Sequence, residues 1–422
     1  MASAADATGV HAAPVVVPVE GEPIHDGAVA VAGDRIVAVG TRSELVAAAP
    51  DARVREWPGV LLPGLVNAHT HLQYTDYADL ATSGLPFFEW IRTLTTRRRT
   101  WTAAQWQESA RRGVHEALRS GTTAVADIVT DVAVLPVLAR SGLAGTAYVE
   151  VVGVESRRWP ETRAELVATL DGAPRGLRLG LSPHALYTLG TDVARGLAGV
   201  ARERGLRLHP HLAETTEESE YVVAGGGPFA EFGRSMGLAF ELLDGGSGRH
   251  PVAEADALGW LGADSHVAHG VHVDEVGRRT LRERETAVAL CVRSNAVLGA
   301  GQPPVAAYLA EGNPVAIGTD SRASNTSLDV VEEMAAVREL ALAQGIPANG
   351  LAQRLVEAAT TGGAHALGLA DVGRLVPGNR ADLAVFDVPV EGDPYEALLD
   401  HGAGRCVATV LGGRIVHRRV ES

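Results

Sequence analysis

Lysine is absent from the 422-residue sequence, and all 37 positively charged side chains other than histidine are arginines. Cysteine is scarce: Cys291 and Cys406 cannot form a disulfide framework. The 51 acidic residues outnumber the 37 arginines, which argues against nucleic-acid binding, because phosphate contacts need clustered positive charge. No uninterrupted apolar run approaches the roughly 18 residues of a membrane-spanning helix. The first residues resemble no signal peptide, so we expect a soluble, cytoplasmic protein that contacts neither nucleic acid nor membrane.

Both ends of the chain read as short β-strands, and the middle does not. After a small, polar stretch at residues 1–13, which we expect to be disordered, runs such as PVVVPVEG and DGAVAVAGDRIVAVG alternate with turns. Residues 375–419 have the same character, with ADLAVFDVP followed by CVATVLGGRIVHRR. We predict that residues 14–60 and 372–422 form one small β-sandwich domain beside a central domain at residues 61–371.

Strand-like and helix-like runs alternate through the central domain, which is typical of βα units and a parallel sheet. Thr102 and Gln105 fit a capping box that opens a helix ending near residue 119, and residues 191–205, 274–285 and 327–344 also have helical spacing. Eight such units predict an α/β fold, a (β/α)₈ TIM-type barrel with its active site at the carboxyl ends of the strands. The Gly-rich segment 225–262 is a candidate lid. The eight strand-like runs are at residues 62–68, 122–128, 145–152, 177–182, 206–211, 265–269, 287–292 and 314–318.

Residues 61–76, LLPGLVNAHTHLQYTD, end an apolar strand in His69 and His71. Residues i and i+2 of a strand point to the same side, so the two imidazoles project together. Alone, this pair is explained more simply as polar residues at a strand end than as half of a metal site. The other predicted strand ends favour the metal site, because they carry more residues of metal-binding types. These are His184, His209, His211, Glu214, His266, His269, His272 and Asp320.

A catalytic site of the zinc type has about three protein ligands and an open position for water. We assign His69, His71, His211 and Asp320 as ligands of a divalent transition metal, zinc or iron, because imidazole and carboxylate suit both. Such a metal lowers the pKa of its water to roughly 7 and makes hydroxide available at neutral pH. His209 is the alternative to His211, which we favour because it lies nearer the barrel mouth.

Acid–base groups accompany these ligands. Asp320 can also accept the proton of the attacking water. Glu214 lies three residues beyond His211 and can shuttle a proton between water and substrate in the same cavity. We predict that His269 orients the attacking water by hydrogen bonding, with His272 as the alternative.

The motifs NAHTHLQY, LSPHALYT, HLAETTEE, AHGVH and GTDSRASN, with the closing PGNRADLAVFD, resemble the amidohydrolase superfamily. Within it they are most similar to the aminohydrolase branch of nucleobase and nucleoside deaminases and s-triazine chlorohydrolases. The resemblance implies hydrolytic attack on an aromatic amidine carbon, with Glu214 protonating the ring nitrogen and ammonia leaving. A pKa of Glu214 raised by burial would suit that role. Two-metal members commonly bridge the metals with a carboxylated lysine; this sequence has none, so we expect one metal.

The stretch HLQYTDYADLATSGLPFFEWIRTLTTRR resembles the aminofutalosine deaminases of menaquinone biosynthesis. Their substrate, 6-amino-6-deoxyfutalosine, joins an adenine nucleoside to a benzoate, and Arg92 or Arg98 could bind that carboxylate bidentately. Methylthioadenosine/adenosylhomocysteine deaminases hold the ribose with a glutamate at about the position of Arg99, so their substrates are alternatives, as are halogenated triazines. The other expected substrate contacts are Gln73, Tyr74, Trp90, His184 and Ser324.

Two broader questions stay open. A metal-free barrel kept as a non-catalytic scaffold is the alternative from another functional class, and the intact set of metal-binding residues argues against it. The expected partner is a small nucleoside-like molecule. A homodimer is compatible with the predicted fold.

Overall fold

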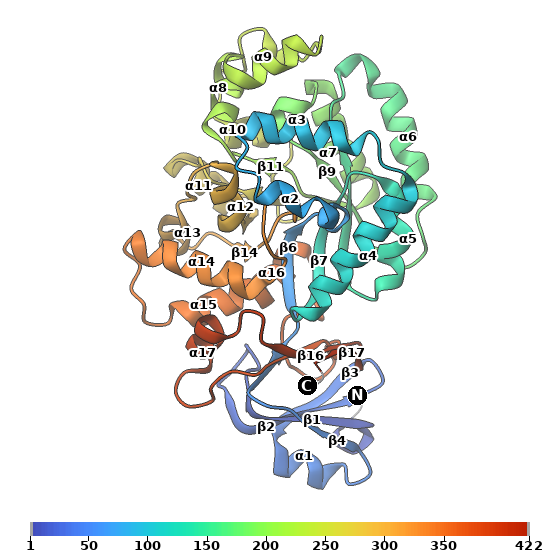
Figure 1. Ribbon diagram of the computed structural model, residues 1–422, viewed down its shortest axis with the longest axis vertical. Coiled ribbons are helices and arrows are strands. Elements are labelled where there is room, and N and C mark those ends of the chain that lie inside the picture. Colours follow the sequence, from blue (N-terminus) through green and yellow to red (C-terminus); the bar gives the residue numbers. More distant parts are fainter. Residues whose placement is uncertain (1–2, 420–422) are drawn as a thin grey trace.

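The computed structural model describes residues 3–419 and has two parts (Figure 1). Helices surround parallel strands in the larger part. The smaller part, at the bottom of Figure 1, is a sheet that contains both ends of the chain. The predicted pairing of the two chain ends is therefore present in this sheet.

The terminal strands form one eight-stranded sheet, in the order β17-β16-β15-β5-β1-β2-β3, with β4 pairing to β1. The described residues therefore do not show the two packed sheets of the predicted β-sandwich. One face buries Val16, Leu61, Leu383 and Val410 in an apolar cluster that joins strands from both chain ends. The strands are β1 (Gly9–Val16), β2 (Ile24–Ala32), β3 (Arg35–Thr41), β4 (Arg53–Glu56), β5 (Val60–Pro63), β15 (Leu383–Phe386), β16 (Cys406–Leu411) and β17 (Arg414–Arg418).

The prediction of disorder over residues 1–13 is wrong where the structure can test it. Residues 9–13 belong to β1, which pairs with β2, β4 and β5, and Ala4–Asp6 form a short 3-10 helix. Residues 1–2 lie outside the described part. The small, polar composition of this stretch hid its structure because the order comes from pairing with strands distant in the sequence.

The larger part contains two parallel sheets, β6-β7-β8-β9-β10 and β11-β12-β13-β14. The predicted fifth strand is divided between them, because Pro210 separates β10 from β11 and proline has no backbone N–H to donate. Isolated parallel bridges, Leu208 to Ser265 and Thr70 to Asp320, connect the sheets at both edges. The strands are β6 (Leu65–Thr70), β7 (Thr122–Val129), β8 (Ala144–Val151), β9 (Leu179–Pro183), β10 (Arg207–Leu208), β11 (His211–Leu212), β12 (His266–His269), β13 (Ala287–Leu290) and β14 (Val315–Ile317).

The predicted helices are confirmed as α4 (Ala103–Arg119), α7 (Thr191–Arg204), α11 (Glu275–Glu283) and α14 (Val330–Ala343). The capping box of α4 is present: the Thr102 side chain accepts from the N–H of Gln105, whose side chain accepts from the N–H of Thr102. Within residues 3–419, no helix has both the length and the apolar character needed to cross a membrane. The other helices are α1 (Arg42–Ala48), α2 (Ala78–Ala81), α3 (Phe87–Arg98), α5 (Leu135–Ser141), α6 (Trp159–Asp171), α8 (Thr216–Ala224), α9 (Gly227–Ser235), α10 (Pro251–Ala257), α12 (Val292–Leu298), α13 (Val305–Glu311), α15 (Leu351–Glu357), α16 (Gly363–Leu367) and α17 (Pro394–His401).

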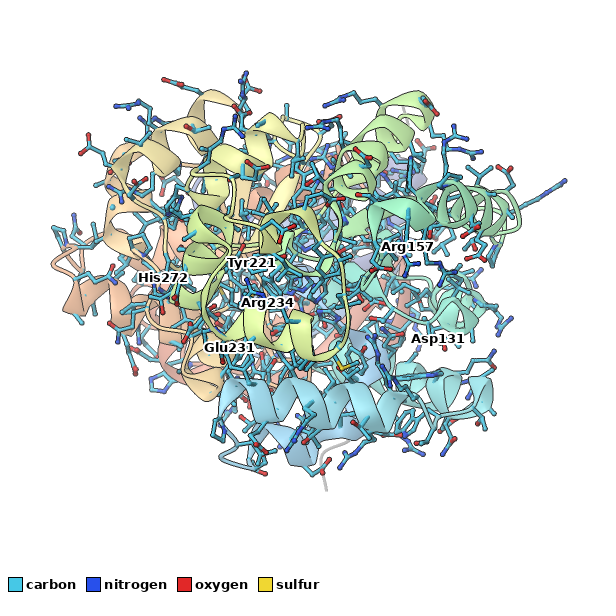
Figure 2. The ribbon with its side chains drawn as sticks, turned by 90° about the horizontal axis from the view of Figure 1, so that it is seen from above. Asp131, Arg157, Tyr221, Glu231, Arg234 and His272 are labelled. Atoms are coloured by element: carbon cyan, nitrogen blue, oxygen red, sulfur yellow. The ribbon has the colours of Figure 1, made fainter. Side chains whose placement is uncertain are left out.

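The candidate lid covers the end of the molecule farthest from the terminal sheet. Seen from above, α9, which carries Glu231 and Arg234, lies across the middle of that end (Figure 2). Phe229 of α9 stacks on Tyr187 at a centroid distance of 3.7 Å and meets Phe88 of α3 edge-on at 4.9 Å. Aromatic contacts thus hold α3 and α9 together over the strand ends. Movement of the segment stays a prediction.

Candidate active site

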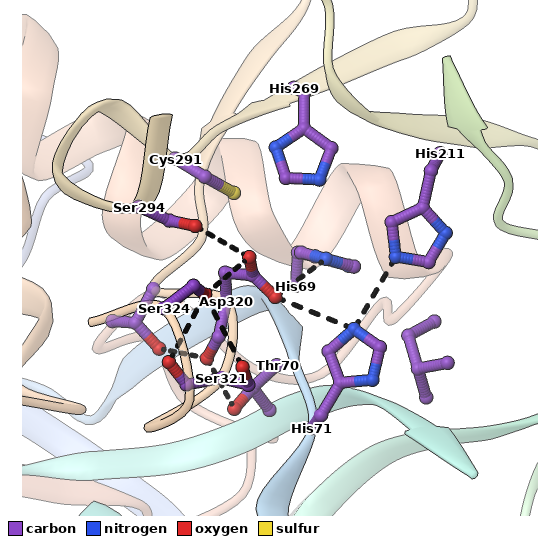
Figure 3. Close-up of polar contacts among 12 residues, drawn as sticks. His69, Thr70, His71, His211, His269, Cys291, Ser294, Asp320, Ser321 and Ser324 are labelled. Atoms are coloured by element: carbon purple, nitrogen blue, oxygen red, sulfur yellow. Dashed lines mark hydrogen bonds and ion pairs between the residues drawn. The ribbon is translucent and has the colours of Figure 1, made fainter. Parts of the chain in front are cut away.

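The strand ends bring the predicted metal ligands together (Figure 3). His69 lies near the end of β6, His71 directly follows that strand, His211 begins β11, and Asp320 follows β14. Asp320 has a φ of +57°, and His269 at the end of β12 has a φ of +72°, in the left-handed region that favours glycine. Strained backbone of this kind concentrates at functional sites, where the surrounding structure holds a side chain in place.

The ligand atoms of these four residues converge. Nε2 of His69 and Nε2 of His71 each lie 3.4 Å from Oδ1 of Asp320. Nε2 of His211 lies 3.3 Å from Nε2 of His71. All four side chains are buried, and no two ligand atoms of the group His69, His71 and Asp320 are more than 4.8 Å apart. The four predicted ligands therefore form one cluster that a single ion can bridge.

Hydrogen bonds determine which imidazole nitrogens are free. His209 Nδ1 donates to the carbonyl of His266 at 2.9 Å, so His209 Nε2 carries a lone pair and accepts from His69 Nδ1 at 2.8 Å. Nε2 of His69 is left unprotonated, buried and without a hydrogen-bond partner within residues 3–419. His211 Nδ1 donates to the carbonyl of His184 at 3.0 Å, which frees its Nε2 as well. Imidazole lone pairs that converge on a carboxylate suit a divalent transition metal, so these residues fit the ion.

The protonation states of the cluster agree with metal binding. Burial lowers the pKa of His71 to about 4 and that of His211 well below its usual value, so both imidazoles are neutral at neutral pH. Neutral imidazole and ionised carboxylate are the forms that coordinate a metal.

Two serines hold the outer oxygen of the Asp320 carboxylate (Figure 3). Oδ2 accepts a hydrogen bond from Ser294 at 2.6 Å and one from Ser324 at 2.8 Å, while Oδ1 faces the histidines. Ser324 is fully buried and does not line the cavity, so its hydroxyl is directed at Asp320 and not into the space predicted for the substrate. Sequence reasoning missed Ser294, which lies in the first turn of α12 and belongs to no recognisable motif.

Glu214 and His269 lie beside the metal-ligand cluster. Burial raises the pKa of Glu214, as the sequence predicts, and its Oε1 lies 3.7 Å from Nε2 of His269. His269 Nδ1 donates to the amide oxygen of Asn295 at 3.0 Å, which orients the ring. The backbone N–H of Glu214 donates to Oε2 of Glu218 at 2.9 Å, and sequence reasoning missed this second buried carboxyl. Glu214 is thus a buried carboxyl beside the cluster of predicted metal ligands.

His209 and His272, the alternatives to His211 and His269, form hydrogen bonds with other parts of the protein. His209 is not among the cavity-lining residues, and it supports His69 from behind, as described above. Nε2 of His272 hydrogen-bonds the carbonyl of Ala300 at 2.7 Å. The preference for His211 and His269 over these neighbours therefore agrees with the geometry.

A cavity of about 280 Å³ opens next to the cluster. His71, His211, Glu214, His269 and Asp320 line one end of it. The walls are mostly apolar, and the predicted lid segment contributes to them. A mainly apolar cavity with a few convergent polar groups is typical of a small-molecule site. The aromatic side chains of the walls are Tyr74, Phe87, Phe88, Trp90, Tyr187, Phe229, Phe232 and Phe240.

Four predicted substrate contacts, Tyr74, Trp90, Arg98 and His184, line this cavity. Arg98 forms no ion pair within the described residues, whereas its neighbour Arg97 pairs with Asp79 at 2.7 Å. Burial lowers the pKa of His184 to about 3, so this imidazole is neutral. Tyr74 and Glu150 lie near enough to act on the Arg98 guanidinium, but it forms no ion pair within the described residues and lines the cavity wall, where a ligand can reach it.

Gln73 and Arg92 are not part of the cavity lining. Gln73 is fully buried, and its side-chain amide bonds the N–H of Asp131 and the carbonyl of Ile128. Arg92 has a side chain 67% exposed and pairs with Glu89 at 3.0 Å. Six positions separate Arg92 from Arg98 on α3, which places the two on different faces of the helix. Of the two candidate arginines, only Arg98 reaches the cavity.

Comparisons with known proteins show what this chain is similar to. The Amidohydrolase family matches residues 60–416, and a short match to an imidazolonepropionase-like composite domain of bacteria covers residues 27–52. The 5-methylthioadenosine/S-adenosylhomocysteine deaminase of Nitratidesulfovibrio vulgaris is 33% identical over 417 residues, 93% of this chain and 88% of the relative. The aminodeoxyfutalosine deaminase of Deinococcus radiodurans is 36% identical over 356 residues, 81% of each chain.

A solved structure is similar over almost the whole chain. It is an adenosine deaminase from Xanthomonas campestris with bound zinc, and it superimposes with a TM-score of 0.80 at 25% identity. The similarity covers 98% of this chain and 93% of that one. The family match spans most of the sequence and includes every predicted metal ligand. The chain belongs to the amidohydrolase family and is a hydrolase that acts on carbon–nitrogen bonds.

Proposed function

We propose that this protein is a metal-dependent hydrolytic deaminase that removes the 6-amino group of an adenine nucleoside as ammonia. The observation that carries the proposal is the group of His69, His71, His211 and Asp320 at one end of a mostly apolar cavity, with the buried Glu214 beside it. An aromatic amidine needs a nucleophilic water on one side and a proton donor for its ring nitrogen on the other. The names of the relatives, adenine nucleoside deaminases, support the same substrate class.

The residues divide the chemistry between them. His69, His71, His211 and Asp320 would hold a divalent zinc or iron ion, which when bound would supply Lewis acidity and lower the pKa of a water. Asp320, fixed by Ser294, accepts the proton of the attacking water. Glu214, whose pKa burial raises, donates its proton to the ring nitrogen. Asp320 passes the proton it took from water to the departing amine, and the hydroxyl proton of the tetrahedral carbon returns to Glu214 as the carbonyl forms. His269, oriented by its hydrogen bond to an amide, positions the water at the reacting carbon.

A closed (β/α)₈ barrel is the architecture that this proposal assumes. We infer it from the parallel bridges that join the two sheets at both edges and from one shared apolar cluster. That cluster contains Val66 of β6, Ile128 of β7, Tyr148 of β8, Ala289 of β13 and Ala316 of β14. Side chains from strands of both sheets thus pack together in one core, as the interior of a barrel requires.

The substrate that we favour is 6-amino-6-deoxyfutalosine, the aminated futalosine of menaquinone biosynthesis. Its carboxylate needs a cationic partner in the cavity; Arg98 lines the cavity and forms no ion pair within residues 3–419, although Glu150 is among the charges that act on it. Arg99 also lines the cavity and offers a second guanidinium. The alternatives are methylthioadenosine or adenosylhomocysteine, a halogenated triazine, and a non-catalytic scaffold. The fit of the ligand set to a metal argues against the scaffold.

An ammonia-release screen of the purified, metal-loaded protein tests the reaction. We expect release from at least one of adenosine, 5′-methylthioadenosine and 6-amino-6-deoxyfutalosine, and about one equivalent of zinc or iron per chain. No release from any of the three would overturn the deaminase proposal. A chain that binds no metal after reconstitution would favour the scaffold.

Arg98→Met tests the finer choice of substrate. This substitution keeps most of the apolar length of the side chain and removes the charge. We expect kcat/KM for 6-amino-6-deoxyfutalosine to fall roughly tenfold or more, because a charge-assisted hydrogen bond is lost, while kcat/KM for methylthioadenosine changes little. Arg92→Met is the matched control, since Arg92 is exposed on the same helix. Equal losses on both substrates would argue against a carboxylate contact.

A further inference from the structure

One carboxylate in the cavity has no part in the chemistry described above. Glu150 lies near the end of β8 and lines the cavity. Its Oε2 accepts a hydrogen bond from the hydroxyl of Thr130 at 2.7 Å, and that hydroxyl accepts one from Tyr74 at 3.2 Å. The chain of hydroxyls holds the carboxylate in one orientation. Sequence reasoning did not select Glu150, because it belongs to none of the recognised motifs.

The other oxygen of Glu150 lacks a donor. Oε1 is buried and has no hydrogen-bond partner in the part of the chain that the structure describes. A carboxylate oxygen only accepts hydrogen bonds, and a buried acceptor that stays unpaired destabilises the structure. A buried acceptor on a cavity wall is therefore placed to bind a group that the chain itself does not supply.

The neighbouring side chains do not supply the missing donor. The nitrogens of His184 and His211 lie within 4.8 Å of a Glu150 oxygen, but both rings donate elsewhere. His211 Nδ1 donates to a backbone carbonyl. His184 Nδ1 donates to Thr188, whose own hydroxyl hydrogen goes to the carbonyl of residue 185 at 3.0 Å. The remaining nitrogen of each neutral ring carries a lone pair and therefore accepts. Arg98 lines the same cavity and Glu150 is among the charges that act on it, but the two side chains form no ion pair or hydrogen bond within the described residues.

A second metal ion does not explain this corner. Glu150, His184 and His211 are close enough to hold a cation together. The free Nε2 of His211, however, already faces His71 in the ligand cluster, and one lone pair cannot serve two ions. The two remaining side chains are fewer than the about three protein ligands of a stable site. The partner of Glu150 is therefore a donor on the substrate.

We infer that Glu150 binds a ribose hydroxyl of the nucleoside substrate, which rests on the proposed function. The ring nitrogens N1, N3 and N7 of adenine accept hydrogen bonds and offer nothing to a carboxylate. The 6-amino group donates, but it has to lie at Glu214 and the metal ligands, where it leaves as ammonia. The 2′- and 3′-hydroxyls are the donors that remain on every adenine ribonucleoside. Glu150 is on this basis a specificity-determining residue that selects ribosides over deoxyribosides.

The test changes Glu150 and the sugar hydroxyls of the substrate, separately and together. The kcat/KM values for adenosine, 2′-deoxyadenosine, 3′-deoxyadenosine and 2′,3′-dideoxyadenosine are measured for wild type and Glu150→Gln. We expect wild type to prefer adenosine over the dideoxy compound at least about tenfold, because the analogue leaves the buried Oε1 of Glu150 unpaired. Glu150→Gln should lose most of that preference by acting poorly on adenosine and normally on the dideoxy compound. The two monodeoxy compounds identify the hydroxyl.

Binding without turnover gives a second readout. The dissociation constants of the same nucleosides are measured by calorimetry in a Glu214→Gln background, with and without Glu150→Gln. The glutamine still accepts from Thr130, so the fold is kept, and an unchanged melting temperature checks this. Glu165→Gln, an exposed change on α6, is the matched control and should leave all values unchanged.

The outcomes separate the two proposals. If wild type does not distinguish adenosine from the dideoxy compound, or if Glu150→Gln weakens both equally in turnover and in binding, the inference about Glu150 is wrong and the deaminase proposal stands. If none of these nucleosides, nor 5′-methylthioadenosine or 6-amino-6-deoxyfutalosine, releases ammonia, the proposed function itself is wrong. A Glu150→Gln effect confined to compounds with a sugar hydroxyl supports both.

Discussion

Replacement of His209 should weaken metal binding although we do not assign His209 as a metal ligand. Its Nε2 accepts the proton of His69 Nδ1 at 2.8 Å, and its own Nδ1 donates to the carbonyl of His266 at 2.9 Å. The relay keeps the proton of His69 on Nδ1 and leaves Nε2 free for the metal. His209→Leu removes the acceptor, so His69 can no longer be held in this tautomer and orientation.

The expected loss of metal affinity follows from the usual contribution of a group that hydrogen-bonds and orients a ligating histidine. Removal of the group that orients a ligating histidine typically costs about 10–100-fold in metal affinity, or about 1.4–2.7 kcal/mol. The N–H of His69, which is fully buried, also loses its partner, and this should lower the free energy of unfolding by about 1–3 kcal/mol. His209→Gln retains a side-chain oxygen that can accept from His69 and should recover part of both losses.

The assay is the dissociation constant for zinc, measured by competition with a chelator of known affinity. Wild type, His209→Leu and His209→Gln are compared with His211→Ala, which removes a ligand. His401→Gln, at an exposed position of α17, controls for loss of a histidine as such. If His209→Leu binds zinc as tightly as wild type, His209 does not control which nitrogen of His69 is free. A loss in His209→Gln as large as that in His211→Ala would make His209 itself a ligand.

The remaining predictions concern the acid–base groups. His211→Ala should lose metal and activity together, whereas Glu214→Gln should keep its metal content and lose turnover; loss of metal from Glu214→Gln would contradict a proton-transfer role. Ser294→Ala should lower kcat roughly tenfold and leave the metal content unchanged, because Asp320 loses a hydrogen bond to a charged oxygen; unchanged kcat would remove Ser294 from the site. Burial raises the pKa of Asp127 to about 8, so its stabilising contribution is complete below pH 4 and is lost as pH rises toward 8. Denaturant titrations should show the stability of wild type, relative to Asp127→Asn, falling by up to about 1.4 kcal/mol per pH unit over this interval, and a pH-independent difference would contradict the shift.

The grouping of the proposed metal ligands was predictable because their signals are local. The alternation of side chains along a strand places His69 and His71 on one side, and parallel strands bring their carboxyl ends to one edge. These two facts gather residues as distant in sequence as His69 and Asp320 at one place, and the structure has them 3.4 Å apart. The four predicted helices also follow from local rules, namely apolar spacing and, in α4, a capping box.

Other parts of the site depend on contacts that no local pattern encodes. Arg92 and Arg98 were equal candidates in the sequence, and the direction in which α3 faces the cavity separates them. Ser324 follows Asp320 by four residues, yet its hydroxyl turns back to the carboxylate instead of toward the substrate. The order of residues 9–13 likewise arises from pairing with strands far along the chain.

His69, in the motif that ends β6, has some properties that the sequence determines and others that depend on the tertiary structure. The sequence by itself determined that His69 carries a metal-binding side chain at a strand end, because strand periodicity and residue chemistry are local properties. Only the tertiary structure decided which nitrogen of that ring is free, because the proton is held by His209, 140 positions away. It also decided that Glu150 has an unpaired oxygen, since the absence of a donor is a property of all its neighbours in space.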